Sequence, residues 1–150
     1  MTTEVQVSRN RMHVSYLRTV VSRIARAAGM TRKDGQGIEE AVAQVCLRSF
    51  AAGGDDSQSP ITVRLVAGDS RVTAEMFHAS PEAASSWACE FSAERSRTLD
   101  EIRGLADRVE LLREGDSCTV RIEKYSSDVG SPASKSPAYL APAGSANLQR

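Results

Sequence analysis

The sequence has few of the features that mark several common classes of protein. Only 5% of its 150 residues are aromatic and its formal net charge at pH 7 is zero. It therefore offers neither interleaved aromatic side chains nor an overall positive field, which argues against a nucleic-acid partner. No apolar run approaches the length of a membrane span, and the N-terminus lacks the apolar core of a signal peptide. We expect a cytoplasmic protein without membrane contact.

Cysteine and histidine are also scarce. The three cysteines, Cys46, Cys89 and Cys118, lie far apart within apolar patterns, and none belongs to a C-x-x-C pair. This spacing favours buried thiols in a reducing compartment over a metal site or a disulfide framework. His78 has no cysteine or histidine near it in sequence, so it predicts no metal site. The chain also lacks a P-loop and a nucleophile elbow.

The composition that remains predicts one folded domain followed by a tail. An apolar content of 41% over 150 residues is enough to build a core. From Ser126 to Arg150 the chain is instead rich in Ser, Ala, Pro and Gly. Such a segment cannot bury enough apolar surface to offset its ordering entropy. We therefore predict a domain over residues 1–125 and a mobile tail over residues 126–150.

The segment from Gly37 to Gly54 has the strongest helical pattern in the chain. Its apolar residues recur at helical spacing, with Asp34 as the expected N-cap. These apolar residues are Ile38, Ala41, Val42, Val45, Leu47 and Phe50. A second row, Glu40, Gln44 and Arg48, recurs every four residues along one face. This polar stripe is either a solvated face or part of a site.

The rest of the chain predicts further helices and two hairpins. Strands alternate apolar and polar residues, whereas helices place apolar residues three and four apart. The predicted elements are a short strand at Glu4–Ser8, a helix at Ser15–Ala28, a hairpin from Ile61 to Met76, a helix or loop from Ser80 to Phe91, a helix from Thr98 with Leu99, Ile102, Leu105, Ala106 and Val109 inward, and a hairpin joining Glu110–Leu112 to Cys118–Lys124. Helices on one face of a mostly antiparallel sheet make an α+β two-layer sandwich.

Three short segments resemble a known family. Tyr16-Leu17-Arg18, Ala41-Val42-Ala43-Gln44 and the run from Gly104 to Val109 occur in the order seen in the anti-sigma-factor serine kinases. These bacterial proteins belong to the histidine-kinase-like (GHKL) ATPase superfamily. The resemblance runs from about Glu4 to Tyr125, and it implies the histidine-kinase-like ATPase fold and a protein partner.

The resemblance also assigns a role to the polar stripe. In that family the second helix carries a Glu that acts as general base and, four residues later, an Asn that holds Mg²⁺. The matching positions here are Gln44 and Arg48. Gln44 cannot take up a proton, and Arg48 brings a fixed positive charge to the place of the cation. Shifting the register to Glu40 and Gln44 keeps a carboxylate but displaces the site by one helical turn.

The other nucleotide-binding motifs of the family depart in the same way. Its Asp and glycines are missing at every position that the resemblance identifies. Those positions are His78 and Ser80 after the first hairpin, Ser96, Arg97 and Thr98 before the late helix, and Ser117 and Thr119 in the last hairpin. We interpret this as a fold that is retained while the ATP-binding site has been lost. We predict no catalytic residue, no metal and no cofactor.

Three hypotheses on function follow. The first is a non-catalytic regulatory module that binds a sigma factor or an anti-anti-sigma protein, with a homodimer as one expected state because family members often dimerise. The second is an active serine kinase that binds ATP and Mg²⁺ through an altered site, with Arg48 and Arg97 on the phosphates. The third is a small domain that binds an acidic partner or nucleic acid through a basic strip, which consists of Arg11, Arg18, Arg26 and Arg32.

Overall fold

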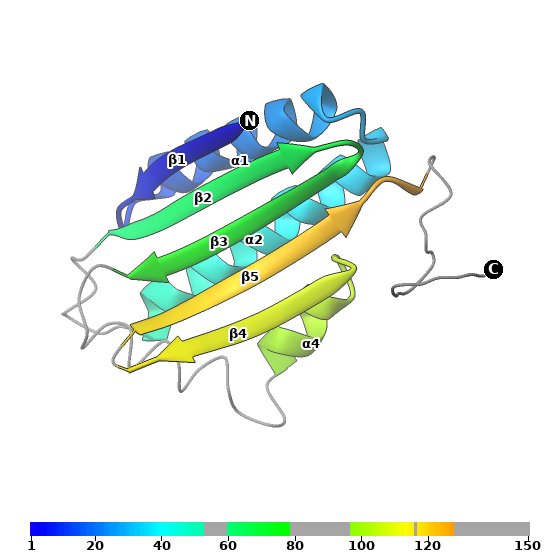
Figure 1. The fold of residues 1–150 in the computed structure, drawn as a ribbon. Coiled ribbons are helices and arrows are strands. Elements are labelled where there is room, and N and C mark those ends of the chain that lie inside the picture. The colour runs from blue at the N-terminus through cyan, green and yellow to red at the C-terminus, as the bar shows by residue number, and fades with distance from the viewer. Residues whose placement is uncertain (53–59, 79–96, 116, 128–150) are drawn as a thin grey trace, which may run out of the picture.

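Helices packed on one antiparallel sheet make up the structure. The computed structural model describes residues 1–52, 60–78, 97–115 and 117–127. Within them the element order is β1 (Thr2–Val7), α1 (Arg11–Ala27), α2 (Arg32–Ala52), β2 (Ile61–Gly68), β3 (Arg71–His78), α4 (Arg97–Arg103), β4 (Arg108–Glu114) and β5 (Ser117–Tyr125), as Figure 1 shows. This is an α+β protein, as the sequence predicted.

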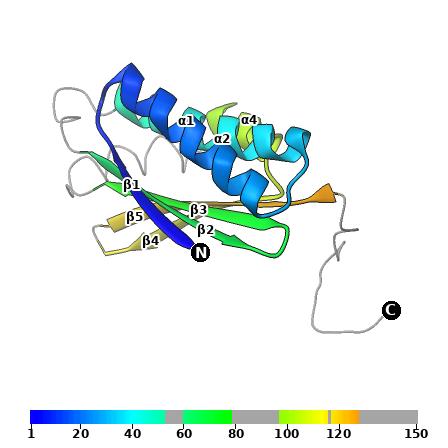
Figure 2. The ribbon, with the colours of Figure 1, turned by 90° about the horizontal axis from the view of Figure 1, so that it is seen from above.

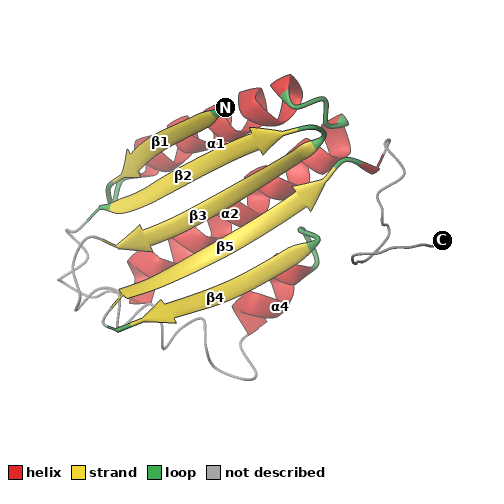
Figure 3. Cartoon of the chain, in the orientation of Figure 1, coloured by secondary structure: helices red, strands yellow, loops and turns green. Residues whose placement is uncertain are grey.

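The five strands pair in the order β1-β2-β3-β5-β4, and every pair is antiparallel. Successive side chains of a strand point to opposite faces, and on β2, β3 and β5 the apolar set faces the helices. Figures 2 and 3 show the described helices on one side of this sheet. The core lies between the two layers, and its largest fully buried side chains include Leu17, Ile38, Leu65, Met76, Ile102 and Ile122.

Both long helices begin earlier than predicted. α1 starts at Arg11, because the Asn10 side chain accepts a hydrogen bond of 2.8 Å from the backbone N of Met12 and caps the helix. α2 starts at Arg32, and its cap is Thr31 rather than Asp34. Thr31 Oγ1 accepts from the Asp34 backbone N at 3.1 Å and donates to Asp34 Oδ2 at 2.8 Å, so the two side chains satisfy each other and the first turn.

α2 also buries a slightly different set of side chains from the predicted one. Leu47, assigned to the apolar face from its spacing, is 40% exposed. Ser49 is buried instead, because its hydroxyl donates to the Val45 backbone oxygen at 2.6 Å and so needs no water.

The late helix is shorter than predicted. α4 ends at Arg103. There the Gly104 backbone N donates to the backbone oxygens of both Asp100 and Glu101, which tightens the last turn. Leu105, Ala106 and Val109 were predicted to continue the helix, but they lie in the connection and in β4. They still pack against the core, so their burial was predicted correctly and their conformation was not.

The two hairpins confirm the predictions, with longer strands in the second. β2 and β3 turn at Asp69 and Ser70, and β4 and β5 pair from Arg108 to Glu123. Cys118, Val120 and Ile122 are buried as expected. The predicted helix or loop between Ser80 and Phe91 lies outside the described residues, as does the tail from residue 128 onward.

The first residues of the predicted tail belong to the folded domain. The Ser126 backbone N donates to the Ser70 oxygen at 2.8 Å, and Ser126 is buried. Ser127 donates to Asp34 Oδ2 from both its backbone N and its hydroxyl, each at 2.8 Å. Residues 126 and 127 therefore contact the folded domain, and the predicted tail from residue 128 lies outside the described residues.

No helix in the described part of the chain is long and apolar enough to cross a membrane.

Candidate functional site

The polar stripe on α2 begins at Glu40, whose two carboxylate oxygens are both engaged. Arg18 of α1 donates to Oε1 at 2.9 Å, and Gln44 donates to Oε2 at 2.7 Å. These two hydrogen bonds, with the Arg18 charge, outweigh partial burial and hold the pKa of Glu40 below its ordinary value. A carboxylate with a lowered pKa is a weak base, so Glu40 is poorly suited to accept a proton from a substrate.

Gln44 and Arg48 have separate partners. Gln44 turns to Glu40 within α2, whereas Arg48 Nη2 lies 3.5 Å from Glu101 Oε1 of α4. The Arg48 and Glu101 side chains are each about half exposed, at 46% and 51%. An amide and a guanidinium in these positions can donate hydrogen bonds but cannot accept a proton, and the guanidinium repels a divalent cation.

Of the other predicted positions, His78 lies on the helix face of the sheet, whereas Ser117 and Thr119 lie on the open face. His78 is buried at the end of β3, and burial lowers its pKa, which favours the neutral ring at pH 7. Ser117 and Thr119 line a groove of about 460 Å³ formed by sheet residues that include Arg64, Phe77 and Arg121. Those side chains lie on the sheet face opposite α2, so the sheet separates them from Gln44 and Arg48.

The remaining predicted positions are described only in part. Ser80 and Ser96 lie outside the described residues. Arg97 and Thr98 form the first turn of α4, but their side chains are also outside the described set. The capping by Thr98 and the phosphate contact by Arg97 therefore stay predictions.

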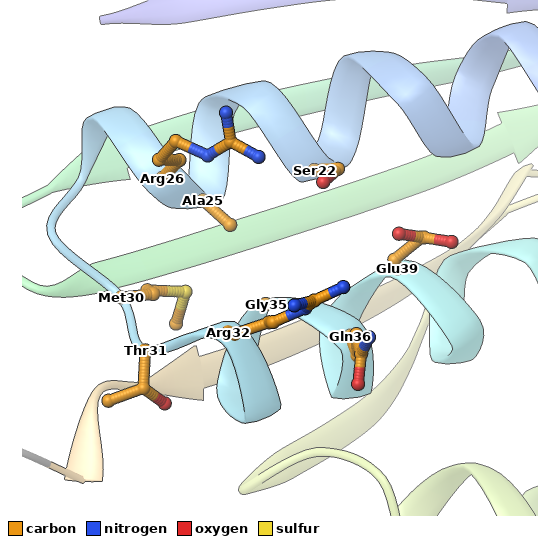
Figure 4. Close-up of a pocket in the computed structure, with 9 residues that line it drawn as sticks. All are labelled: Ser22, Ala25, Arg26, Met30, Thr31, Arg32, Gly35, Gln36 and Glu39. Atoms are coloured by element: carbon orange, nitrogen blue, oxygen red, sulfur yellow. The ribbon is translucent and has the colours of Figure 1, made fainter.

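A second groove, of about 470 Å³, lies between the end of α1 and the first turns of α2 (Figure 4). It is lined by Ser22, Ala25, Arg26, Met30, Thr31, Arg32, Gly35, Gln36 and Glu39. Arg26 comes from α1, while Arg32 and Glu39 come from α2 (Figure 4). The groove therefore carries two guanidinium groups and one carboxylate, and this carboxylate also lies 3.5 Å from Arg18.

The basic strip of the third hypothesis is partly neutralised. Arg18 lies 2.9 Å from Glu40 and 3.5 Å from Glu39, so its charge is compensated by α2. Arg26 and Arg32 share their groove with Glu39. The sequence could not show the pairing of Arg18, because its acidic partners stand on the neighbouring helix.

A row of charges on the open face of the sheet was not foreseen. Glu4, Arg64, Glu75, Arg121 and Glu110 stand directly opposite one another across all five strands. Neighbours along the row lie within 2.8 to 3.7 Å. In the sequence, each strand carries a charged residue at an outward position, and the sign of the charge alternates. The pairing of β3 with β5 was needed to show that these residues lie in one row. Each charge in the row therefore has an oppositely charged neighbour, and the row as a whole carries three carboxylates and two guanidinium groups.

The described residues contain no group of three or more His, Cys, Asp or Glu side chains placed to hold a metal ion. Cys46 and Cys118 are buried and free, as predicted, while Cys89 lies outside the described residues. Burial raises the pKa of the Cys46 thiol to about 12, so it stays protonated and unreactive at neutral pH.

No protein-family model and no curated protein matches this chain. The resemblance to anti-sigma-factor serine kinases therefore stays a prediction from three short segments. Evidence for a function must therefore come from the contacts of α2 and from the surfaces around it.

Proposed function

We propose that this protein is a non-catalytic regulatory module with the histidine-kinase-like ATPase fold, and that it acts by binding another protein. The partner class is a bacterial sigma factor or an anti-anti-sigma protein. The single observation that carries the proposal is the engaged stripe on α2. Glu40 is held by Arg18 and Gln44, and Arg48 is held by Glu101.

The side chains of that stripe fit a helix without catalytic activity better than an active one. Phosphoryl transfer needs a group that positions or deprotonates the attacking hydroxyl and a cation that neutralises the phosphates. Here the position of the base is Gln44, and the nearest carboxylate has a lowered pKa. The position of the cation ligand is Arg48, which bridges to α4. The active-kinase hypothesis would require Arg48 to leave Glu101 and bind phosphate, and no contact of the described residues favours it.

The order of the elements supports the same family. A strand, two helices, a hairpin, a late helix and a second hairpin follow one another, as in the resemblance. Because α1 and α2 lie together on the sheet (Figure 2), they offer one continuous helical surface to a partner.

That surface carries exposed apolar side chains. Met12 and Tyr16 of α1 are 77% and 63% exposed and lie four residues apart, so they share one face of the helix. Leu47 of α2 is also exposed. Tyrosine and methionine are enriched at protein interfaces, and the tyrosine ring gives much contact area for little lost conformational freedom. We assign the partner surface to α1 around Tyr16.

The test is calorimetric titration of purified sigma factors and anti-anti-sigma proteins into the full chain, with and without Mg-ATP. We expect one partner class to bind with the same affinity in both conditions. Tyr16→Ala should weaken that binding by about tenfold or more. Val66→Ala is the matched control, because Val66 is an exposed apolar residue at 38% but lies on the open sheet face.

Two outcomes would contradict the proposal. One is binding that requires Mg-ATP, which would restore a role for nucleotide. The other is an equal loss of affinity in Tyr16→Ala and Val66→Ala, which would remove the partner surface from α1.

A further inference from the structure

The groove between the end of α1 and the first turns of α2 carries two cations that are not neutralised by the protein. Arg26 and Arg32 line it from the two helices, and both residues are exposed. Among the described residues, neither guanidinium group has an acceptor within ion-pair or hydrogen-bond distance. Arg18 differs from them, because Glu39 and Glu40 compensate its charge.

Glu39 is the carboxylate of the groove, and its own partner is shared. Its Oε2 lies 3.5 Å from Arg18 Nη1, but the same Nη1 lies closer to Glu40 Oε1, at 2.9 Å. The two groove arginines do not pair with Glu39 either. This carboxylate can therefore accept hydrogen bonds from a further cation.

The opposite charges of the groove lie along one line without touching. Arg32 and Glu39 are seven residues apart and so share one face of α2. Figure 4 shows the Arg32 side chain extended along α2 in the direction of Glu39, with Arg26 on the α1 side. Because Arg32 and Glu39 form no ion pair, a gap remains between the cations and the carboxylate.

The rest of the lining suits a small organic molecule. Ala25 and Met30 give the groove an apolar floor and are 1% and 8% exposed, and Ser22 and Gln36 add a hydroxyl and an amide. A methionine side chain adapts its shape to an apolar ligand. The volume of about 470 Å³ is in the usual range of small-molecule sites.

We propose that this groove binds a free α-amino acid with an aliphatic side chain. The carboxylate of the ligand lies between the guanidinium groups of Arg26 and Arg32, and its ammonium group donates to Glu39. The aliphatic side chain covers Met30. Guanidinium groups bind carboxylates through paired hydrogen bonds, so the order of charges along the groove matches the order in the zwitterion.

Other charged ligands match the groove less well. A phosphate monoester carries a charge of about −1.5 to −2 at pH 7 and no cation, so Glu39 would repel it, and the same holds for Mg-ATP. The last residue of a peptide has a carboxylate without an ammonium group, and the first residue has the reverse. The attraction comes from side chains rather than from the N-terminus of α2, because Thr31 already caps that end.

The experiment is an NMR titration of the full, isotope-labelled chain with L-leucine, followed at the backbone amide of Gly35, which lines the groove. We expect a saturable shift with a dissociation constant of about 1 mM or below, and no shift at Gly115 in the turn between β4 and β5. N-acetyl-leucine lacks the ammonium group and leucinamide lacks the carboxylate. Each should bind about tenfold more weakly than leucine, because one charged hydrogen-bonding group is lost.

Substitutions assign each charge of the ligand to a side chain. Arg26→Gln and Arg32→Gln should each weaken leucine binding by about tenfold. Glu39→Gln should weaken the binding of leucine but not of N-acetyl-leucine, because that probe has no ammonium group for Glu39. Lys33→Gln is the matched control and should leave binding unchanged, since Lys33 is an exposed cation of the same turn that does not line the groove.

The proposal is overturned if leucine gives no saturable shift up to about 10 mM, or if leucinamide binds as tightly as leucine. N-acetyl-leucine that binds as tightly as leucine would also overturn it and would identify the ligand as the end of a peptide. An equal loss of leucine binding in Lys33→Gln and Arg32→Gln would do the same, because it would report only the overall charge of this region. The titration contains no partner protein, so its result is independent of the proposed regulatory function.

Discussion

The two halves of α2 are bound into the molecule in different ways. The first turns of the helix contact distant segments of the chain: the buried Asp34 carboxylate accepts hydrogen bonds from Ser127, and Gly37 packs against the backbone of Leu105. The stripe further along has half-exposed partners, as in the Arg48–Glu101 ion pair. Buried, fully satisfied polar contacts are costly to lose, whereas exposed ion pairs contribute little. Substitutions along the stripe should therefore cost less stability than substitutions in the first turns of α2.

The first prediction, and the largest effect, concerns Gly37. A Cβ at this position would lie 2.7 Å from the Leu105 backbone oxygen, so either α2 or the chain after α4 has to move. We expect Gly37→Ala to lower the free energy of unfolding by about 2 to 3 kcal/mol, measured by urea denaturation.

Gly35, two residues earlier in the same helix, is the matched control. A Cβ there would meet only the Ala25 Cβ at 3.4 Å, so Gly35→Ala should be neutral or stabilising by up to about 1 kcal/mol. Equal effects of the two substitutions would show that the close contact at Gly37 is not what holds this half of the helix.

The second prediction concerns Asp34, which is 6% exposed. Its Oδ2 accepts three hydrogen bonds, from Thr31 and twice from Ser127, and Lys124 lies 3.7 Å from Oδ1. We expect Asp34→Ala to cost about 2 kcal/mol at pH 7, because these donors lose their acceptor.

This loss should depend on pH in one direction. Burial alone would raise the pKa of Asp34, but the Ser127 and Thr31 hydrogen bonds and the Lys124 charge lower it below its ordinary value of 3.8. A carboxyl with a lowered folded-state pKa stabilises the protein above its unfolded pKa, and the contribution fades as the pH falls through the folded one. The difference between wild type and Asp34→Ala should therefore be constant from pH 6 to 8 and shrink below about pH 4. A difference that does not change with pH would contradict the role of the ionised carboxylate.

The third prediction, and the smallest effect on stability, concerns the stripe. Gln44→Ala and Arg48→Ala should each change the free energy of unfolding by less than about 0.5 kcal/mol, since Glu40 keeps its Arg18 partner and Glu101 is exposed to solvent. Chemical denaturation at low and moderate salt would check this. A loss above about 1 kcal/mol for either variant would make the stripe a structural element and would erase the contrast between the two halves of α2.

The sequence predicted the elements of the fold better than their ends. The alternation in β2, β3 and β5 and the helical spacing in α1 and α2 are local signals, and both gave the correct element type. The start of α2 was misplaced because Gly35 and Gly37 look like turn residues, whereas here Gly37 makes room for the Leu105 carbonyl within a helix. A contact between segments this far apart leaves no mark in the local pattern.

The candidate site could likewise be predicted from the sequence only in part. That Glu40, Gln44 and Arg48 share one face follows from helical spacing alone. Their partners Arg18 and Glu101 are 22 and 53 residues away from Glu40 and Arg48 respectively, so they could be identified only from the packing of α1 and α4 on α2. The charge row on the open face required the strand order as well.

The most direct test of the central claim, that the stripe on α2 no longer supports nucleotide chemistry, is calorimetric titration of Mg-ATP into the full chain. We expect no binding at nucleotide concentrations up to about 1 mM, in the wild type and in Arg48→Ala alike. Binding of Mg-ATP at micromolar concentration that disappears in Arg48→Ala would contradict it, because Arg48 would then be a phosphate ligand rather than a bridge to Glu101.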